Sequence, residues 1–132
     1  MKVTINLEIP DGIKLKDFQD YETWIRYEVS GFNIQRGYTS NRSLKNMVEV
    51  AVSWAGDILR DHNRRYLIVI DQGFISWDVP KEATITITIK PVGQEGVMKM
   101  IKKTVTAQTY RRHREHHLSQ AISDKLLKGE QL

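Results

Sequence analysis

The stretch ATITITIK spans residues 83–90 and alternates isoleucine with threonine without a break. Successive side chains of a β-strand point to opposite faces, so Ile85, Ile87 and Ile89 would share one face while the threonines share the other. β-Branched residues also favour the extended backbone of a strand. We therefore expect a half-buried strand here, with its isoleucines in a hydrophobic core and its threonines directed away from it.

Other segments repeat this pattern less regularly. Residues 3–9 alternate apolar and polar side chains, and Pro10-Asp11-Gly12 supplies a turn, which predicts a first strand. The apolar run YLIVI at 66–70 is followed by DQG and then FISWDV, which predicts a hairpin with a short glycine-containing loop. Residues 97–108 fit two structures equally well: their apolar residues have helical spacing, but the Thr-Val-Thr run suits a strand paired to 83–90.

Two helices are predicted with more support than a third. Residues 43–63 place their apolar side chains on one arc, as in an amphipathic helix, and residues 109–128 show a similar pattern that ends at Gly129. Residues 14–31 are compatible with a helix or a strand, and we favour a helix. Residues 31–42 contain Gly31, Gly37, Ser40 and Asn41, which predicts a loop.

These elements predict an α+β fold: an antiparallel sheet of four or five strands with two or three helices packed mainly on one face. A length of 132 residues suits one domain spanning 1–132, with a basic C-terminal segment at 97–128. The chain has no cysteine, so disulfides and thiolate metal sites are excluded. Its longest apolar run is far too short to cross a bilayer, and the start of the chain lacks the apolar region of a signal peptide. We therefore expect a cytoplasmic protein without a membrane partner or a cofactor.

The positive charge is concentrated at the C-terminal end. Residues 1–90 hold 12 basic and 12 acidic side chains, whereas residues 91–132 hold 8 basic and 4 acidic ones. The segment 99–114 carries six cations and no acid: Lys99, Lys102, Lys103, Arg111, Arg112 and Arg114. Arginine forks and lysine ammonium groups suit phosphate oxygens. The leading hypothesis is a non-enzymatic protein that contacts nucleic acid or another phosphate-rich ligand through these six residues.

The main alternative is a small protein-interaction module, such as an inhibitor or accessory subunit, that occupies a larger partner. Six of the eleven aromatic residues lie within residues 18–38. Core packing explains most of them, but Tyr21 or Tyr38 could anchor a protein interface, where tyrosine is enriched. A contact between identical chains is also compatible with the sequence.

A metal-dependent enzyme is the third hypothesis. His113 and His117 lie four residues apart within RRHREHH, residues 111–117, and would share one face of a helix. Two imidazoles do not complete a metal site, and the sequence has neither a His-Glu-x-x-His motif nor a glycine-rich phosphate loop. We therefore assign no metal ligands and no catalytic residues, and expect that the protein is not an enzyme.

The phosphate hypothesis makes a quantitative prediction. If about six phosphates are contacted, affinity for duplex DNA should fall on the order of a thousandfold between about 50 and 200 mM salt, because binding releases counterions. Fluorescence anisotropy of labelled DNA and RNA measures this fall. Replacing Arg111, Arg112 and Arg114 together with glutamate should abolish binding without changing the melting temperature; absence of binding by the unaltered protein at the lower salt would contradict the hypothesis.

Overall fold

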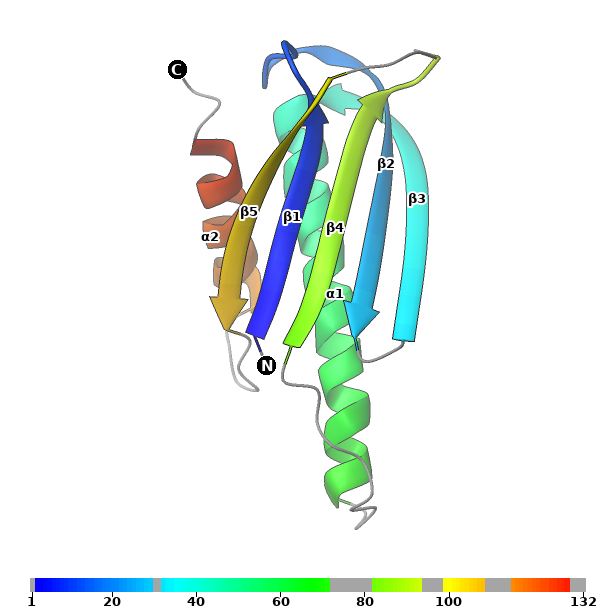
Figure 1. Ribbon diagram of the computed structural model, residues 1–132, viewed down its shortest axis with the longest axis vertical. Helices are drawn as coiled ribbons and strands as arrows, with labels where there is room; N and C mark the ends of the chain where they lie inside the picture. Colours follow the sequence, from blue (N-terminus) through cyan, green and yellow to red (C-terminus); the bar gives the residue numbers. More distant parts are fainter. Residues whose placement is uncertain (1, 30–31, 72–81, 94–98, 109–114, 129–132) are drawn as a thin grey trace.

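The computed structural model describes residues 2–29, 32–71, 82–93, 99–108 and 115–128. They form five strands and two helices (Figure 1). In chain order these are β1 (Lys2–Pro10), β2 (Phe18–Val29), β3 (Phe32–Ser43), α1 (Leu44–Asp71), β4 (Glu82–Pro91), β5 (Met100–Gln108) and α2 (Glu115–Leu127). The predicted α+β class is confirmed.

The five strands form one mixed sheet in the order β3-β2-β4-β1-β5. β1 and β4 are parallel, with Ile5 beside Ile85 and Leu7 beside Ile87, whereas every other neighbouring pair is antiparallel. The prediction of a purely antiparallel sheet is therefore wrong. The reason is the long helix: α1 runs back along the sheet after β3, so β4 starts at the same end as β1 (Figure 1).

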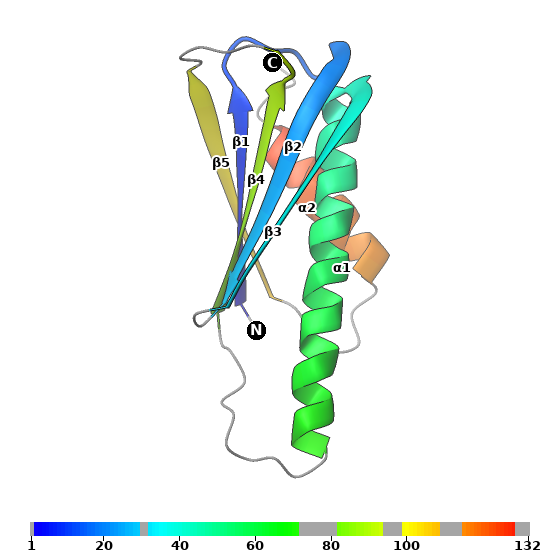
Figure 2. The same ribbon diagram turned by 90° about the vertical axis from the view of Figure 1, so that its right-hand side faces the viewer.

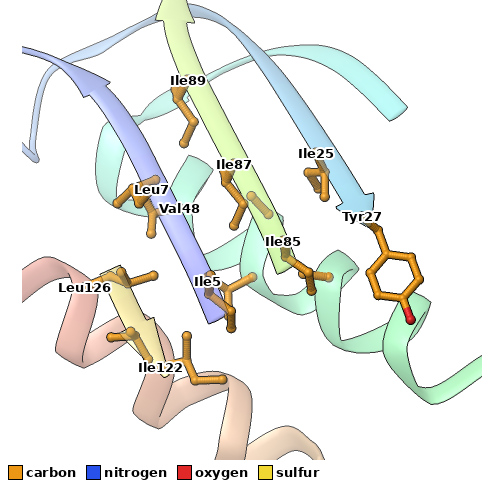
Figure 3. Packing of buried hydrophobic residues seen from close by; sticks show 14 of the residues in the cluster. Ile5, Leu7, Ile25, Tyr27, Val48, Ile85, Ile87, Ile89, Ile122 and Leu126 are labelled. Atoms are coloured by element: carbon orange, nitrogen blue, oxygen red, sulfur yellow. The ribbon is translucent and has the colours of Figure 1, made fainter. Parts of the chain in front are cut away.

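Both helices lie on the same side of the sheet (Figure 2). The isoleucines of β4 face this side as predicted, and Ile85, Ile87 and Ile89 are fully buried. They pack with alternate residues of β1 and β2, with the apolar arc of α1, and with Ile122 and Leu126 of α2 (Figure 3). A hydrophobic core of this kind, between one sheet face and the helices that cover it, supplies the main driving force for folding.

The start of α1 is joined to the loop before β2. Ser43 precedes the helix, and its Oγ accepts a hydrogen bond of 3.2 Å from the Asn46 amide, which is the geometry of an N-cap. The amides of Leu44 and Lys45 donate to the carbonyls of Asp17 and Leu15, at 3.2 and 3.0 Å. Three amides that would lack partners at a helix N-terminus are thereby satisfied, and the direction in which α1 leaves the sheet is set.

The favoured helix at 14–31 and the loop at 31–42 are both wrong, because β2 and β3 are paired strands of 12 residues each. Side chains three apart in sequence share a face only on a helix. The burial of β2 instead alternates with a period of two, which buries Ile25, Tyr27 and Val29. In β3 the polar and glycine residues typical of loops belong to an edge strand, where one side of the backbone has no neighbour among the described strands.

Two further predictions are corrected. The run at 66–70 is not a strand, because it lies in α1, which continues to Asp71. A short apolar run fits a buried strand and a buried helix equally well, so its periodicity does not identify it. Adding residues to an existing helix also costs less free energy than starting a new one. Residues 74–79, the second half of the expected hairpin, lie outside the described residues. Residues 100–108 form a strand, β5, but it pairs with β1 instead of 83–90.

The predicted helix at 109–128 is present as α2 from Glu115 to Leu127. The first part of the predicted helix, residues 109–114, lies outside the described residues. Neither helix, within the described parts of the chain, is long and apolar enough to cross a bilayer.

The position of β4 makes Ile87 a sensitive core residue, because it lies between Leu7 and Ile25 on the neighbouring strands. Ile87→Ala should lower the free energy of unfolding by about 2–5 kcal/mol, since it removes buried methyl groups and leaves a cavity. Thr86→Ala, on the opposite face of the same strand, should change it by no more than about 0.5 kcal/mol. Urea denaturation measures both, and equal effects of the two variants would contradict the assigned strand register.

Candidate functional site

The lysines of the predicted phosphate site do not form one surface. Lys102 is exposed on the sheet face away from the helices, beside Glu8 of β1. Lys103, one residue later, is half-buried on the helix-covered face. The Nζ atom of Lys99 lies 3.8 Å from a carboxylate oxygen of Asp11. The other three members, Arg111, Arg112 and Arg114, lie outside the described residues, so their contribution stays a prediction.

The histidine pair is only partly covered by the structure. His113 lies outside the described residues, and His117 belongs to the first turns of α2. Within the described ranges, no three histidine or carboxylate side chains lie close enough together to hold a metal ion. The metal-dependent enzyme remains an untested alternative.

Tyr21, one of the two predicted interface residues, belongs to the core. It is fully buried, and its hydroxyl donates to the Asp17 carbonyl at 3.0 Å and accepts from Gln19 Nε2 at 3.1 Å. Burial raises the pKa of Tyr21 above its ordinary value. The same Asp17 carbonyl accepts the Leu44 amide, so Tyr21 helps to hold the loop against the start of α1. A side chain in this position cannot meet a partner, and we assign it to the structure of the fold.

Among the described residues, the uncovered face of the sheet carries one exposed tryptophan, Trp24 of β2, which is 39% exposed. It lies opposite Gly37 of β3, and a Cβ atom on Gly37 would come within 2.7 Å of the Cε3 and Cζ3 atoms of the indole. The ring therefore rests directly on the glycine backbone, an arrangement known to stabilise glycine in sheets. Its Nε1 atom donates to Glu22 Oε1. Gly37 is required here for close approach, and the contact accounts for the position of Trp24.

The rest of this face is a polar surface on which several groups bond to one another. Thr104 Oγ1 donates to Asn6 Oδ1 at 2.8 Å, and Thr88 Oγ1 donates to Glu8 Oε2 at 3.3 Å, each between neighbouring strands. Arg26 and Glu28 form an ion pair of 3.0 Å. Acidic and basic side chains are mixed across the described strands, so this face lacks the continuous positive field that phosphate recognition requires.

Tyr38, the second predicted interface residue, lies at the β3 edge of the sheet. Its ring centroid is 4.5 Å from that of Trp54 on α1, and the two rings are tilted by 51°. Trp54 is 37% exposed and Tyr38 is half-buried. The pair closes the space between the outermost strand and the helix, and it presents an aromatic surface beside an edge that no described strand covers.

Two arginines lie on either side of Tyr38 along β3. Strand alternation puts Arg36, Tyr38 and Arg42 on the helix-covered side of the strand, and both arginines are exposed. Burial raises the pKa of Tyr38 above its ordinary value, while the nearby Thr23 hydroxyl and the Arg42 guanidinium partly oppose that rise. Arg42 is therefore near enough to Tyr38 for its positive charge to act on the tyrosine hydroxyl.

Sequence reasoning missed three residues of this region: Trp54, Arg36 and Arg42. Trp54 is absent from the apolar arc that predicts α1, and a tryptophan off that arc was the available signal. The sequence contains no signal for the two arginines, because side chains in a predicted loop, such as residues 31–42, have no common direction.

The contact of Trp24 with Gly37 predicts that the effect of a Gly37 substitution on stability depends on whether the indole is present, which a double-mutant cycle measures. Gly37→Val should destabilise the protein by about 1–3 kcal/mol, because the new side chain displaces the indole. In a Trp24→Ala background the same substitution should be neutral or stabilising, since valine is a better strand residue than glycine. Thermal or urea denaturation of the four proteins measures the cycle, and additive effects would show that the ring does not lie on Gly37.

No protein-family model matches the sequence, no curated protein is significantly similar to it, and no solved structure matches the fold at a significant level. A functional assignment therefore depends on the geometry of this chain alone.

Proposed function

We propose that this chain is a non-enzymatic protein-interaction module that binds a partner protein through the β3 edge and the adjoining side of α1. The observation that carries the proposal is the contact between Tyr38 and Trp54, two aromatic rings 4.5 Å apart that join an outer strand to a helix while Trp54 keeps 37% of its surface exposed. Tyrosine and tryptophan are enriched at interface centres because they bury a large area with little loss of side-chain freedom.

The backbone of β3 supports the same conclusion. The strand is 12 residues long, contains no proline, and pairs on one side only among the described strands. Outer strands are commonly short or interrupted, because their free amides and carbonyls readily pair with other chains. Strand-addition binding sites use an exposed edge of this kind, and here an exposed tryptophan, Trp54, lies near it.

The open sheet face offers less to a partner. Two of its threonine hydroxyls, those of Thr88 and Thr104, already bond across the strands, and its arginine at position 26 is paired with Glu28. A partner would gain few new hydrogen bonds there while displacing water from satisfied polar groups. Trp24 is the exception, but its ring covers Gly37.

Phosphate binding through the basic C-terminal segment is the second candidate. It is favoured by Lys102, which is exposed on β5, the strand that leads toward Arg111, Arg112 and Arg114. It is weakened by Lys103 and Lys99, of which one faces the helices and the other pairs with Asp11. We rank it below protein binding for this reason.

Selection from a random peptide library tests the proposed function without a known partner. The immobilised protein should enrich peptides that lose at least about tenfold in affinity on Trp54→Ala, because truncating an aromatic residue at an interface centre costs at least about 1.4 kcal/mol. Titration of the synthesised peptides measures the loss.

Phe18→Ala is the matched control, since Phe18 is 70% exposed at the start of β2 and lies apart from the aromatic pair. Its affinity for the same peptides should be unchanged. Enrichment of no peptide, or equal binding by the Trp54→Ala variant, would overturn the proposal.

A further inference from the structure

We infer that the partner segment is an extended acidic peptide that adds to the outer side of β3 as a sixth strand, an assignment of partner chemistry that rests on the proposed function. Three features of the edge carry it: the direction of its side chains, a positive charge that is not paired with any described acid, and the aromatic surface between the charges.

The two faces of β3, one covered by the helices and one open, carry side chains of different kinds. On the helix-covered side the strand presents Ile34, Arg36, Tyr38, Ser40 and Arg42; on the other side it presents Asn33, Gln35, Gly37, Thr39 and Asn41. The second row contains no ionisable group. Recognition by charge would therefore come from the helix-covered side, where an added strand would also meet Trp54.

Neither arginine of this row forms an ion pair with a residue that the structure describes. β3 contains no acidic residue, and Arg36 forms no ion pair with any part of the chain that the structure describes. The Nε atom of Arg42 donates to a neutral group, Ser40 Oγ, at 3.1 Å. Guanidinium groups hold carboxylates through two parallel hydrogen bonds, so each arginine can bind an acidic side chain of a neighbouring strand.

Carboxylates of α1 must be considered because they could repel an acidic partner. Asp57 and Asp61 lie on the helix one and two turns beyond Trp54. Arg60 lies between them, 3.5 Å from an oxygen of Asp57 and 3.7 Å from one of Asp61. This internal pairing reduces their field, while Arg36 and Arg42 remain available.

The opposite edge of the sheet is not equivalent. Beside β5, helix α2 buries Ile122, Leu126 and Leu127 against the core, and Val105 of β5 is buried beneath it. Among the described residues no aromatic side chain borders that edge, because β5 and its flanking described residues contain none. A partner strand that paired with β5 would lie near the positive charges of Lys102 and Lys103 but would contact no described aromatic side chain.

The spacing along β3 defines the peptide. Arg36 and Tyr38 are two residues apart and Tyr38 and Arg42 are four apart, all on one side. Cross-strand neighbours lie opposite each other, so the added strand should place an acid, an apolar residue two positions on, and a second acid four positions further. The order is reversed when the added strand runs the other way.

The capped peptide TETVTVTET meets this pattern in both directions, and TKTVTVTKT is its charge-reversed control. With a fluorophore at the N-terminus, anisotropy should show the acidic peptide binding at least about tenfold more tightly than the basic one, with the difference shrinking at high salt. Amide hydrogen exchange should show new protection in β3 and no change in β5.

Charge reversal supplies the decisive variants. Arg36→Glu with Arg42→Glu should invert the preference, so that the basic peptide binds more tightly, while Lys102→Glu on β5 should leave it unchanged. The milder pair Arg36→Gln and Arg42→Gln should remove the preference if the reversed variant fails to fold.

Equal binding of both peptides, or protection in β5 instead of β3, would overturn the acidic-strand assignment. The proposed function fails separately, when library peptides are not enriched or do not depend on Trp54. Enriched peptides that depend on Trp54 but lack acidic residues would leave the interaction module intact and remove only the inferred partner chemistry.

Discussion

The parallel pairing of β1 with β4 is the constraint on which the rest of the structure depends. β4 is the central strand, and its isoleucines face the helices with complete burial. Parallel neighbours need a connection that returns the chain to the starting end of the sheet, and α1 supplies it. Once α1 crosses the sheet, one face becomes the core. In the sheet, β2 and β3 lie on one side of β4, and β1 and β5 lie on the other.

This arrangement makes the two edges of the sheet chemically different. α1 passes close to β3, where Trp54 meets Tyr38, whereas α2 packs beside β5 with aliphatic residues. The proposed binding site is a consequence of the crossover, because the same helix that completes the core brings an exposed tryptophan to β3, the outermost described strand on that side. Among the described basic residues of the C-terminal segment, Lys102 and Lys103 lie on opposite faces of β5.

The aromatic residues of β2 lie on different faces of the sheet because successive side chains of a strand alternate in direction. Tyr21, Trp24 and Tyr27 recur every third residue, which on a helix would place them on one side. On a strand the same spacing puts Tyr21 and Tyr27 in the core and Trp24 on the opposite face, as their exposure confirms. Tyr21 then supports the loop at the start of α1, and Trp24 covers Gly37. Their roles follow from the backbone and not from residue type.

The sequence by itself determined the elements whose apolar residues fit either the spacing of a strand or that of a helix, but not both. These are β1, β4, the first part of α1 and the body of α2. It also determined the α+β class and the exclusion of disulfides. Only the tertiary structure decided the identity of β2 and β3, the partner of β5, and the surfaces that hold Tyr38 and Lys102. Strand pairing depends on contacts between residues distant in the chain, such as Glu8 with Lys102 and Trp24 with Gly37, and local periodicity contains no information about them. The candidate site is made of such contacts. Trp54, Arg36 and Arg42 could therefore not be predicted as site residues from the sequence, because their grouping depends on the position of α1 beside β3.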